Sequence, residues 1–231
     1  MQLTADRTER LAALEAIVKL RRATRAFLPE PIGDDLIERA LLVASSTPSN
    51  CNVQPWIVHL VQGATLARLR RTLTEAVSAG TPPDDDFGST KTYPGIYRTR
   101  QIETAQLLYG AIGVERHDKA GRAAASLRNF AMFDAPHVAL LFVPDWAGPR
   151  ELADVGAWAQ TFMLALTASG VASIPQAALG LYPGATRDVL GVPDTQRLLY
   201  GVSFGMADAE APANSFTVGR AALDEIVTIH G

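Results

Sequence analysis

The sequence predicts a domain that combines α-helices with a small β-sheet, in an α+β or α/β sandwich. Two observations carry this prediction. Segments with apolar residues at helical spacing alternate with short, nearly continuous apolar runs that suit buried strands. The chain has 231 residues, of which 48% are hydrophobic, enough for a sizeable core in one large domain or in a domain with an embedded excursion.

Composition excludes several classes of protein. The net charge of −3 and the pI near 5.8 argue against a nucleic-acid or anionic-membrane partner. Cys51 is the single cysteine, which excludes an internal disulfide framework and suits a reducing compartment. No apolar run approaches the roughly 20 residues that span a bilayer, and no signal peptide is evident. We therefore expect a soluble, cytoplasmic protein.

The first 80 residues are expected to hold three helices and one strand. Residues 6–20 should form an amphipathic helix capped by Asp6. After two prolines that break the chain, a second helix is expected to begin at a cap on Asp34. Residues 56–61 suit a buried strand, and a third helix should bury apolar residues at helical spacing, namely Leu66, Leu69, Leu73 and Val77.

Residues 80–130 differ in character from their surroundings. They begin with an acidic, proline-containing stretch that cannot continue a helix, and helical patterns follow around 102–112 and 119–133. We interpret this region as an excursion from the main domain, a lid or a partner-embracing arm. Its aromatic residues either line a pocket or pack the small core of the arm, and the substrate-pocket candidates are Tyr93, Tyr97 and Tyr109.

The second half of the chain supplies most of the predicted core. Residues 137–143 form an almost unbroken apolar run between two prolines, which suits a buried central strand. Residues 154–169 form a nearly all-apolar helix that Gly170 closes. The remaining predicted elements are a short strand leading into a loop at 172–180, a short helix at 186–190, a strand at 198–204, an irregular segment at 208–220 and a last strand or helix at 223–229.

A polar turn lies between the second helix and the first strand. Pro48, Ser49 and Asn50 are turn-formers, and Asn50, Asn52 and Gln54 alternate with two other residues. On an extended backbone this alternation puts three amide side chains on one side, where they offer donors and acceptors to a flat, heteroatom-edged ligand. Alternatively, these amides satisfy the backbone of their own loop.

A basic cluster follows the first helix. Arg21, Arg22 and Arg25 could bind a phosphate through bidentate contacts. They could equally offset the negative end of the helix dipole at the surface, and composition alone favours this surface role. Arg220 stands by itself after the long irregular segment.

Several familiar chemistries lack a signal. No Cys, His, Asp and Glu residues have metal-ligand spacing, so no metal is expected. There is no Gly-x-Ser-x-Gly elbow, no phosphate loop before Lys-Ser/Thr and no Gly-x-Gly-x-x-Gly. His59 and His137 lie in strand-like runs and suit core or edge positions. Cys51 has no histidine nearby in sequence to activate it, and a small buried thiol is expected.

The motifs together resemble those of the FMN-dependent nitroreductase superfamily, and within it the longer bacterial NAD(P)H nitroreductases. Residues 21–27 are similar to the family's phosphate-binding motif, usually Arg-Arg-Ser-x-Arg, although Ala23 replaces the serine. Residues 48–56 match Pro-Ser-x-x-Asn-x-Gln-Pro-Trp, residues 170–177 match the helix end and strand that pass the flavin, and Arg220 falls where a late arginine reaches the phosphate. Members of this family often carry a second cation two residues before the late arginine, and Val218 occupies that position in this chain.

The resemblance implies a fold and an assembly. It implies an α+β three-layer sandwich over residues 1–231, with a central, mainly antiparallel sheet flanked by helices and a cap at about 80–130. It also implies a homodimer of interdigitated subunits with two FMN sites at the interface. The cofactor-binding residues that it assigns are Arg21, Arg22, Ala23, Arg25, Pro48, Ser49, Asn50, Asn52, Gln54, Pro175, Gln176, Ala177 and Arg220.

The resemblance also implies an activity, the reduction of nitroaromatic or quinone-like acceptors. NAD(P)H would deliver a hydride to flavin N5 and leave, and a small aromatic acceptor would then take two electrons in the same pocket. No catalytic side chain is needed, because the cofactor carries the chemistry. The alternatives are reductive dehalogenation or enoyl-type reduction on the same fold, and a non-catalytic flavin-binding protein.

Overall fold

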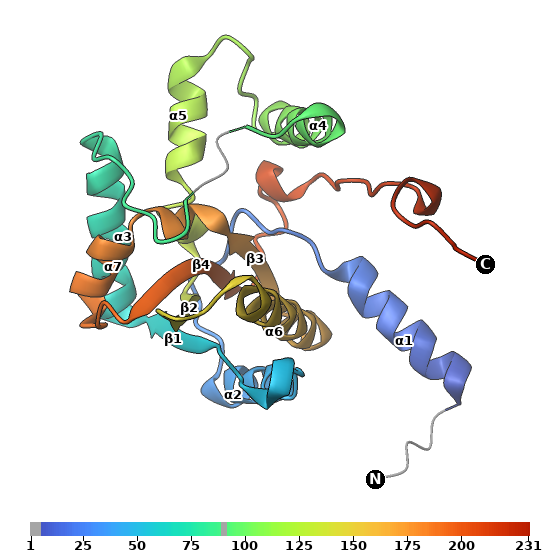
Figure 1. Ribbon diagram of the computed structural model, residues 1–231. Coiled ribbons are helices and arrows are strands. Elements are labelled where there is room, and N and C mark those ends of the chain that lie inside the picture. The colour runs from blue at the N-terminus through green and yellow to red at the C-terminus, as the bar shows by residue number, and fades with distance from the viewer. Residues whose placement is uncertain (1–5, 89–91) are drawn as a thin grey trace.

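A four-stranded antiparallel sheet forms the centre of the computed structural model, which describes residues 6–88 and 92–231 (Figure 1). The strands run in the order β1-β2-β4-β3, and each neighbouring pair is antiparallel. This arrangement confirms the α+β class. The strands are β1 (Ile57–Gln62), β2 (His137–Pro144), β3 (Ala172–Gln176) and β4 (Gln196–Gly205).

Strand β2 is buried on both faces, which explains its nearly continuous apolar sequence. Residues 138–143 are all 0% exposed. Alternate side chains of β2 pack against α2 (Asp34–Ala44) and α6 (Pro149–Ala168) on one face. The others pack with α3 (Gly63–Ser78) and α7 (Pro183–Leu190) on the opposite face. The result is three layers, with the core on both sides of the sheet.

A β-bulge lets β4 supply both layers. The register between β2 and β4 shifts between Leu141 and Phe142, so that Leu141 faces Tyr200 while Phe142 faces Leu198. A bulge inserts one unpaired residue and thereby turns the following side chains over. Leu198 accordingly packs with α3 and α7, whereas Val202 packs with α2 and α6.

The helix ends agree with the sequence in part. The side chain of Asp6 caps α1 (Arg7–Leu20), as expected, by accepting the Arg7 N–H at 2.7 Å. Gly33, and not Asp34, occupies the cap of α2. Helix α6 begins at Pro149, five residues before the expected start, because proline suits the first helical position and Glu151 accepts the Gly148 N–H there at 2.9 Å.

The excursion holds two helices, α4 (Gly95–Ala111) and α5 (Lys119–Leu127). The second ends at Leu127 and is shorter than expected, and a helix could not extend to 133 because residues 132–134 are left-handed. In the C-terminal segment, the expected last strand or helix is a single 3-10 turn at Leu223–Glu225. The other 3-10 turns are η1 (Asn50–Asn52), η2 (Met132–Asp134), η3 (Ala177–Leu181) and η4 (Pro212–Asn214).

Helices α1, α4 and α5 lie outside the three layers, and Figure 1 shows α1 and the C-terminal segment reaching away from the sheet. None of these three helices contains a buried residue. The apolar stripe expected on α1 exists, but Leu11, Leu14 and Val18 are 58%, 52% and 45% exposed. Among the described residues, no helix combines the length and apolar character needed to cross a membrane.

Candidate functional site

The basic cluster predicted from sequence surrounds one cavity. Residues 21–27 leave the end of α1 in extended form, and Ala23 forms a parallel bridge with Ser173 of β3. The irregular segment after η4 brings Arg220 to the same place. The cavity has a volume of about 530 Å³ and its lining includes Arg21, Arg22, Ala23, Arg25, Gln160, Phe216, Val218 and Arg220. We call it the arginine cavity.

The electrostatics of this cavity favour an anion. Within residues 6–88 and 92–231, none of its four arginines forms an ion pair with a carboxylate. Burial lowers the pKa of Arg21, and the nearby charge of Arg220 lowers it further. Burial also lowers the pKa of Arg25. A bound phosphate would relieve both effects, because it supplies the missing negative charge and accepts bidentate hydrogen bonds.

A second, larger cavity of about 1260 Å³ lies beside the first, and Arg25 lines both. We call it the apolar cavity. The end of β3 and the start of η3 form one wall, with Pro175, Gln176 and Ala177. Proline is tolerated there because β3 is an edge strand. The opposite wall comes from α4, α5 and the segment after α5, including Leu108, Ile112, Arg128, Asn129, Phe133 and Asp134.

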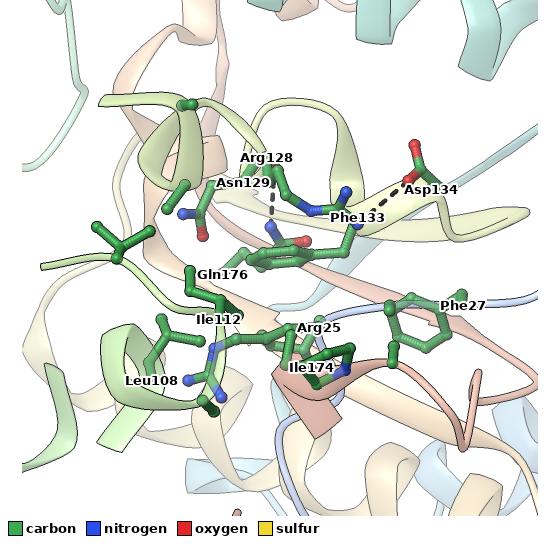
Figure 2. Close-up of a pocket in the computed structure, with 18 of the residues that line it drawn as sticks. Arg25, Phe27, Leu108, Ile112, Arg128, Asn129, Phe133, Asp134, Ile174 and Gln176 are labelled. Atoms are coloured by element: carbon green, nitrogen blue, oxygen red, sulfur yellow. Dashed lines mark hydrogen bonds and ion pairs between the residues drawn. The ribbon is translucent and has the colours of Figure 1, made fainter. Parts of the chain in front are cut away.

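Gln176 ties the two walls of the apolar cavity together (Figure 2). Its side chain is buried, at 2% exposure. Its Nε2 donates to the Asn129 carbonyl oxygen at 2.8 Å, and its Oε1 accepts from Ser203 Oγ at 2.5 Å. A buried amide that is bonded through both its nitrogen and its oxygen fixes its surroundings, so the end of β3 and the segment after α5 hold a fixed relative position.

The amide-rich turn differs from its expected conformation. Cys51, Asn52 and Gln54 have φ values of 50°, 56° and 51°, so the backbone is left-handed and not extended. Its amides partly bond within the loop, since Ser49 Oγ accepts the Gln54 N–H at 2.8 Å and Gln54 Nε2 donates to the Asn52 carbonyl at 3.2 Å. The expectation of a buried thiol was also wrong, because Cys51 is exposed.

The turn lies apart from both cavities within one protomer. The Asn50 N–H donates to Asp154 of α6 at 3.1 Å, which places the turn against the first half of that helix. No residue from 48 to 54 lines the arginine cavity or the apolar cavity. The structure therefore brings together the arginines and, next to them, residues 175–177, and leaves the amide-rich turn elsewhere on the protomer surface.

The predicted substrate-pocket tyrosines also lie outside the two cavities of the protomer. Tyr93 and Tyr97 are 47% and 60% exposed, and Tyr109 is partly buried. The aromatic residues that do line the apolar cavity are Phe27 and Phe133. The sequence offered Phe133 as one of several aromatic residues that could line a pocket. It assigned no role to Arg128 and Asp134, whose signal was only a place in residues 127–137, which resemble the longer bacterial nitroreductases.

Two of the four histidines, His59 and His137, have structural partners. His59 Nε2 lies 2.9 Å from Gln196 Oε1. His137 is buried, and its Nε2 accepts the Ile32 N–H at 2.8 Å. Among the described residues, no group of three or more His, Cys, Asp or Glu is placed to hold a metal ion.

The α+β sandwich therefore holds a cationic cavity beside a larger apolar cavity. This arrangement suits proteins that bind an elongated ligand, anionic at one end and flat and apolar at the other. Residues 18–206 match the family described as "Nitroreductase family". The chain belongs to this family.

Relatives and solved structures agree over nearly the full chain. Nitroreductase NfnB of Mycolicibacterium smegmatis is 37% identical over 92% of this chain and 91% of its own length. A 4-nitrobenzoate reductase of Pseudomonas putida is 35% identical over 89% of this chain and 90% of its own length. The crystal structure of FMN-dependent NfnB from Mycobacterium smegmatis in complex with NADPH superposes with a TM-score of 0.92 and 35% identity, covering 96% of this chain and 100% of that one.

Proposed function

We propose that this protein is an FMN-dependent oxidoreductase that uses NADPH to reduce nitroaromatic compounds. The observation that carries the proposal is the arginine cavity, whose cations have no carboxylate partners among the described residues and which adjoins an apolar cavity. This arrangement suits the phosphate and the ring of FMN. Similarity to the NADPH complex of NfnB and to a 4-nitrobenzoate reductase supports the choice of electron donor and of acceptor class.

FMN, when bound, supplies the hydride chemistry, and the chain supplies binding and positioning. The phosphate would be held by Arg21, Arg22, Arg25 and Arg220, with Ala23 offering only its backbone. Losing one neutral hydroxyl donor at Ala23 typically costs about 1 kcal/mol, which four cations outweigh. The flavin ring would lie against Pro175, Gln176 and Ala177, whose fixed position keeps the ring in place against the apolar cavity.

We further propose that the active form is a homodimer with FMN sites shared between subunits. The protomer exposes 13791 Å², about a third more than the roughly 10,100 Å² expected for a compact monomer of 24.7 kDa. Many of the large apolar side chains that are exposed to solvent lie on α1 and the C-terminal segment, where Ile229 is 89% exposed. The amide-rich turn would reach the FMN of the partner subunit, contributing Pro48, Ser49, Asn50, Asn52 and Gln54.

The excursion at about 80–130, within a single domain of residues 1–231, is proposed to cap the apolar cavity. Two contacts support this role. Leu108 of α4 and Ile112, which caps the end of this helix, line the cavity of their own chain. The root of the excursion is also anchored to the sheet layers, because Asp86 accepts from Arg187 Nη1 at 2.8 Å and from the Leu198 N–H at 2.7 Å. Tyr93, Tyr97 and Tyr109 would then contribute to the pocket only through movement of this cap or through the partner.

An absorbance titration tests the function. The purified protein, reconstituted with FMN, should show a flavin spectrum that bleaches anaerobically with NADPH and returns on addition of a nitroaromatic compound. Bleaching without recovery would point to another acceptor, and failure to bind FMN would refute the proposal.

A matched pair of variants tests the arginine cavity. Arg220→Ala should weaken FMN affinity by about tenfold or more, because it removes a charge-assisted contact. Arg71→Ala removes the same charge from an exposed position on α3 and should leave the affinity unchanged. Equal affinities of the two variants would contradict the assigned role of Arg220.

A further inference from the structure

An ion pair between Arg128 and Asp134 lies on the wall of the apolar cavity formed by the cap (Figure 2). We infer that the Arg128 guanidinium recognises an anionic group of the electron acceptor, so that the preferred acceptors are nitroaromatic compounds that carry a carboxylate. This inference rests on the proposed function, because it assumes that the apolar cavity receives the acceptor.

The ion pair is accessible and easily exchanged. Arg128 Nη2 lies 3.2 Å from Asp134 Oδ2, and the two side chains are 47% and 59% exposed. Exposed pairs of this kind contribute little net stability, because water and salt screen them. A carboxylate that arrives on an aromatic ring can therefore replace Asp134, and it gains the bidentate geometry that guanidinium groups favour.

The backbone beside the ion pair is unusual. Met132, Phe133 and Asp134 have φ values of 51°, 51° and 66°, and three consecutive left-handed residues without glycine are costly. The turn is bonded to Arg128 itself, whose carbonyl accepts the Phe133 N–H at 3.0 Å. Such strain persists where the surrounding structure imposes it, and here it places the Phe133 ring and the Asp134 carboxylate beside the Arg128 guanidinium.

Asp134 remains close to a second cation, Arg70, when Arg128 binds a ligand. Burial lowers the pKa of Arg70, and the charge of Asp134 partly opposes this effect, so the two groups are within electrostatic reach. Arg70 also donates to the Ala135 carbonyl at 2.9 Å. Release of Arg128 therefore does not leave Asp134 as an uncompensated charge.

The other charged residues of the apolar cavity have different roles. Arg25 also lines the arginine cavity, where we assign it to the phosphate. Asp208 repels anions, and its Oδ1 accepts the Glu210 N–H at 3.1 Å. Among the described lining residues, this leaves Arg128 as the cation available to the acceptor. The apolar side chains around it take the ring, namely Leu108, Ile112, Phe133 and Ile174.

The experiment compares two acceptors that differ by one carboxylate. For the FMN-loaded enzyme, kcat/KM is measured for 4-nitrobenzoate and for nitrobenzene, and the ratio of the two values is the readout. Arg128→Gln should lower this ratio by about threefold to tenfold, mainly by raising KM for the acceptor that carries the carboxylate. Arg128→Lys should give an intermediate ratio, because it keeps the charge and loses the bidentate geometry.

Two further variants separate specific recognition from general charge. Asp134→Asn should raise the ratio, because it removes the competing carboxylate. Arg122→Gln removes a cation from α5, the helix that ends directly before Arg128, without changing the lining of the cavity, and should leave the ratio unchanged. Added salt should lower the ratio of the unaltered enzyme, since the contact is partly exposed.

A binding measurement distinguishes failure of this inference from failure of the proposed function. The Kd for 4-nitrobenzoate is obtained from the change that this compound causes in the oxidised flavin spectrum. Binding that Arg128→Gln weakens, without any turnover by the unaltered enzyme, would refute the proposed function and sustain the assignment of Arg128. A ratio and a Kd that are both unchanged in Arg128→Gln would overturn the assignment and leave the ion pair only closing the turn.

Discussion

The layered core and the outer helices of this protein use apolar residues in opposite ways. In α6, the apolar side chains of Trp158 and Phe162 are 1% and 0% exposed, buried against the sheet of the same chain. In α1, the apolar stripe with Leu11 and Leu14 remains more than half exposed. Both helices follow an apolar pattern in sequence, yet only one of them finds its partner within the protomer.

This difference indicates which part of the molecule buries its apolar surface within one chain. The sheet and its two helical layers satisfy their own apolar faces, so their stability depends on packing within the protomer. The exposed stripe of α1 and the exposed C-terminal segment have the character of surfaces that another molecule covers. The arginine cavity lies between these two regions, since α1 ends at Leu20 and the arginines follow at once.

The largest expected effect concerns the layered core, whose apolar faces are buried within the protomer. Phe162→Ala should lower the free energy of unfolding by about 3–5 kcal/mol, because it removes a fully buried ring and leaves a cavity. Chemical denaturation of the protein measures this change. Phe162→Leu leaves a smaller cavity and should cost less. Similar stabilities for all three proteins would contradict the assignment of α6 to the core.

The next effect concerns α1, whose apolar stripe is exposed in the protomer. If α1 is covered in the proposed homodimer, the double change Leu11→Lys and Leu14→Lys should weaken that dimer by at least about a hundredfold, since burial of each leucine contributes about 1.5–3 kcal/mol. Sedimentation measures the dimer, and far-UV circular dichroism should show that the protomer stays folded.

A control in the same helix sharpens this comparison. Glu15→Gln changes a charge in an exposed pair with Lys19 and should leave the dimer intact. A double variant that remains a dimer and keeps FMN would mean that α1 is not the covered surface.

The smallest effect concerns His137, at the start of the central strand. Burial holds the pKa of His137 below its ordinary value of about 6.5, and its Nε2 must stay unprotonated to accept the Ile32 N–H. As the pH falls below about 6.5, His137 becomes protonated in the unfolded chain but stays neutral in the folded chain, so acidification lowers the free energy of unfolding.

Unfolding at several pH values tests this prediction. The unaltered protein should lose stability between pH 7 and pH 5 through this group, because its pKa is lower in the folded chain than in the unfolded chain. His137→Gln keeps an acceptor for the Ile32 N–H and should lose less over the same range. Identical pH dependence of both proteins would assign the acid sensitivity to other groups.

Much of this architecture could be predicted from the sequence, because the deciding interactions are local or depend on simple periodicity. The unbroken apolar run at 137–143 determined a strand buried on both faces. The spacing of Leu66, Leu69 and Leu73 determined the buried face of α3. The motifs at 21–27 and 48–56 identified the family, since their order and residue types survive without knowledge of their positions in space.

Other features were decided only by the tertiary structure, because they depend on contacts between residues distant in sequence. The left-handed backbone at Asn52 and Gln54 replaced the expected extended form, since hydrogen bonds to Ser49 and Asp154 outweigh the alternating pattern. The ion pair of Arg128 and the buried bonds of Gln176 arise where the cap meets the edge of the sheet. Local periodicity carries no information about such meetings, so the wall of the apolar cavity became visible only in the folded chain.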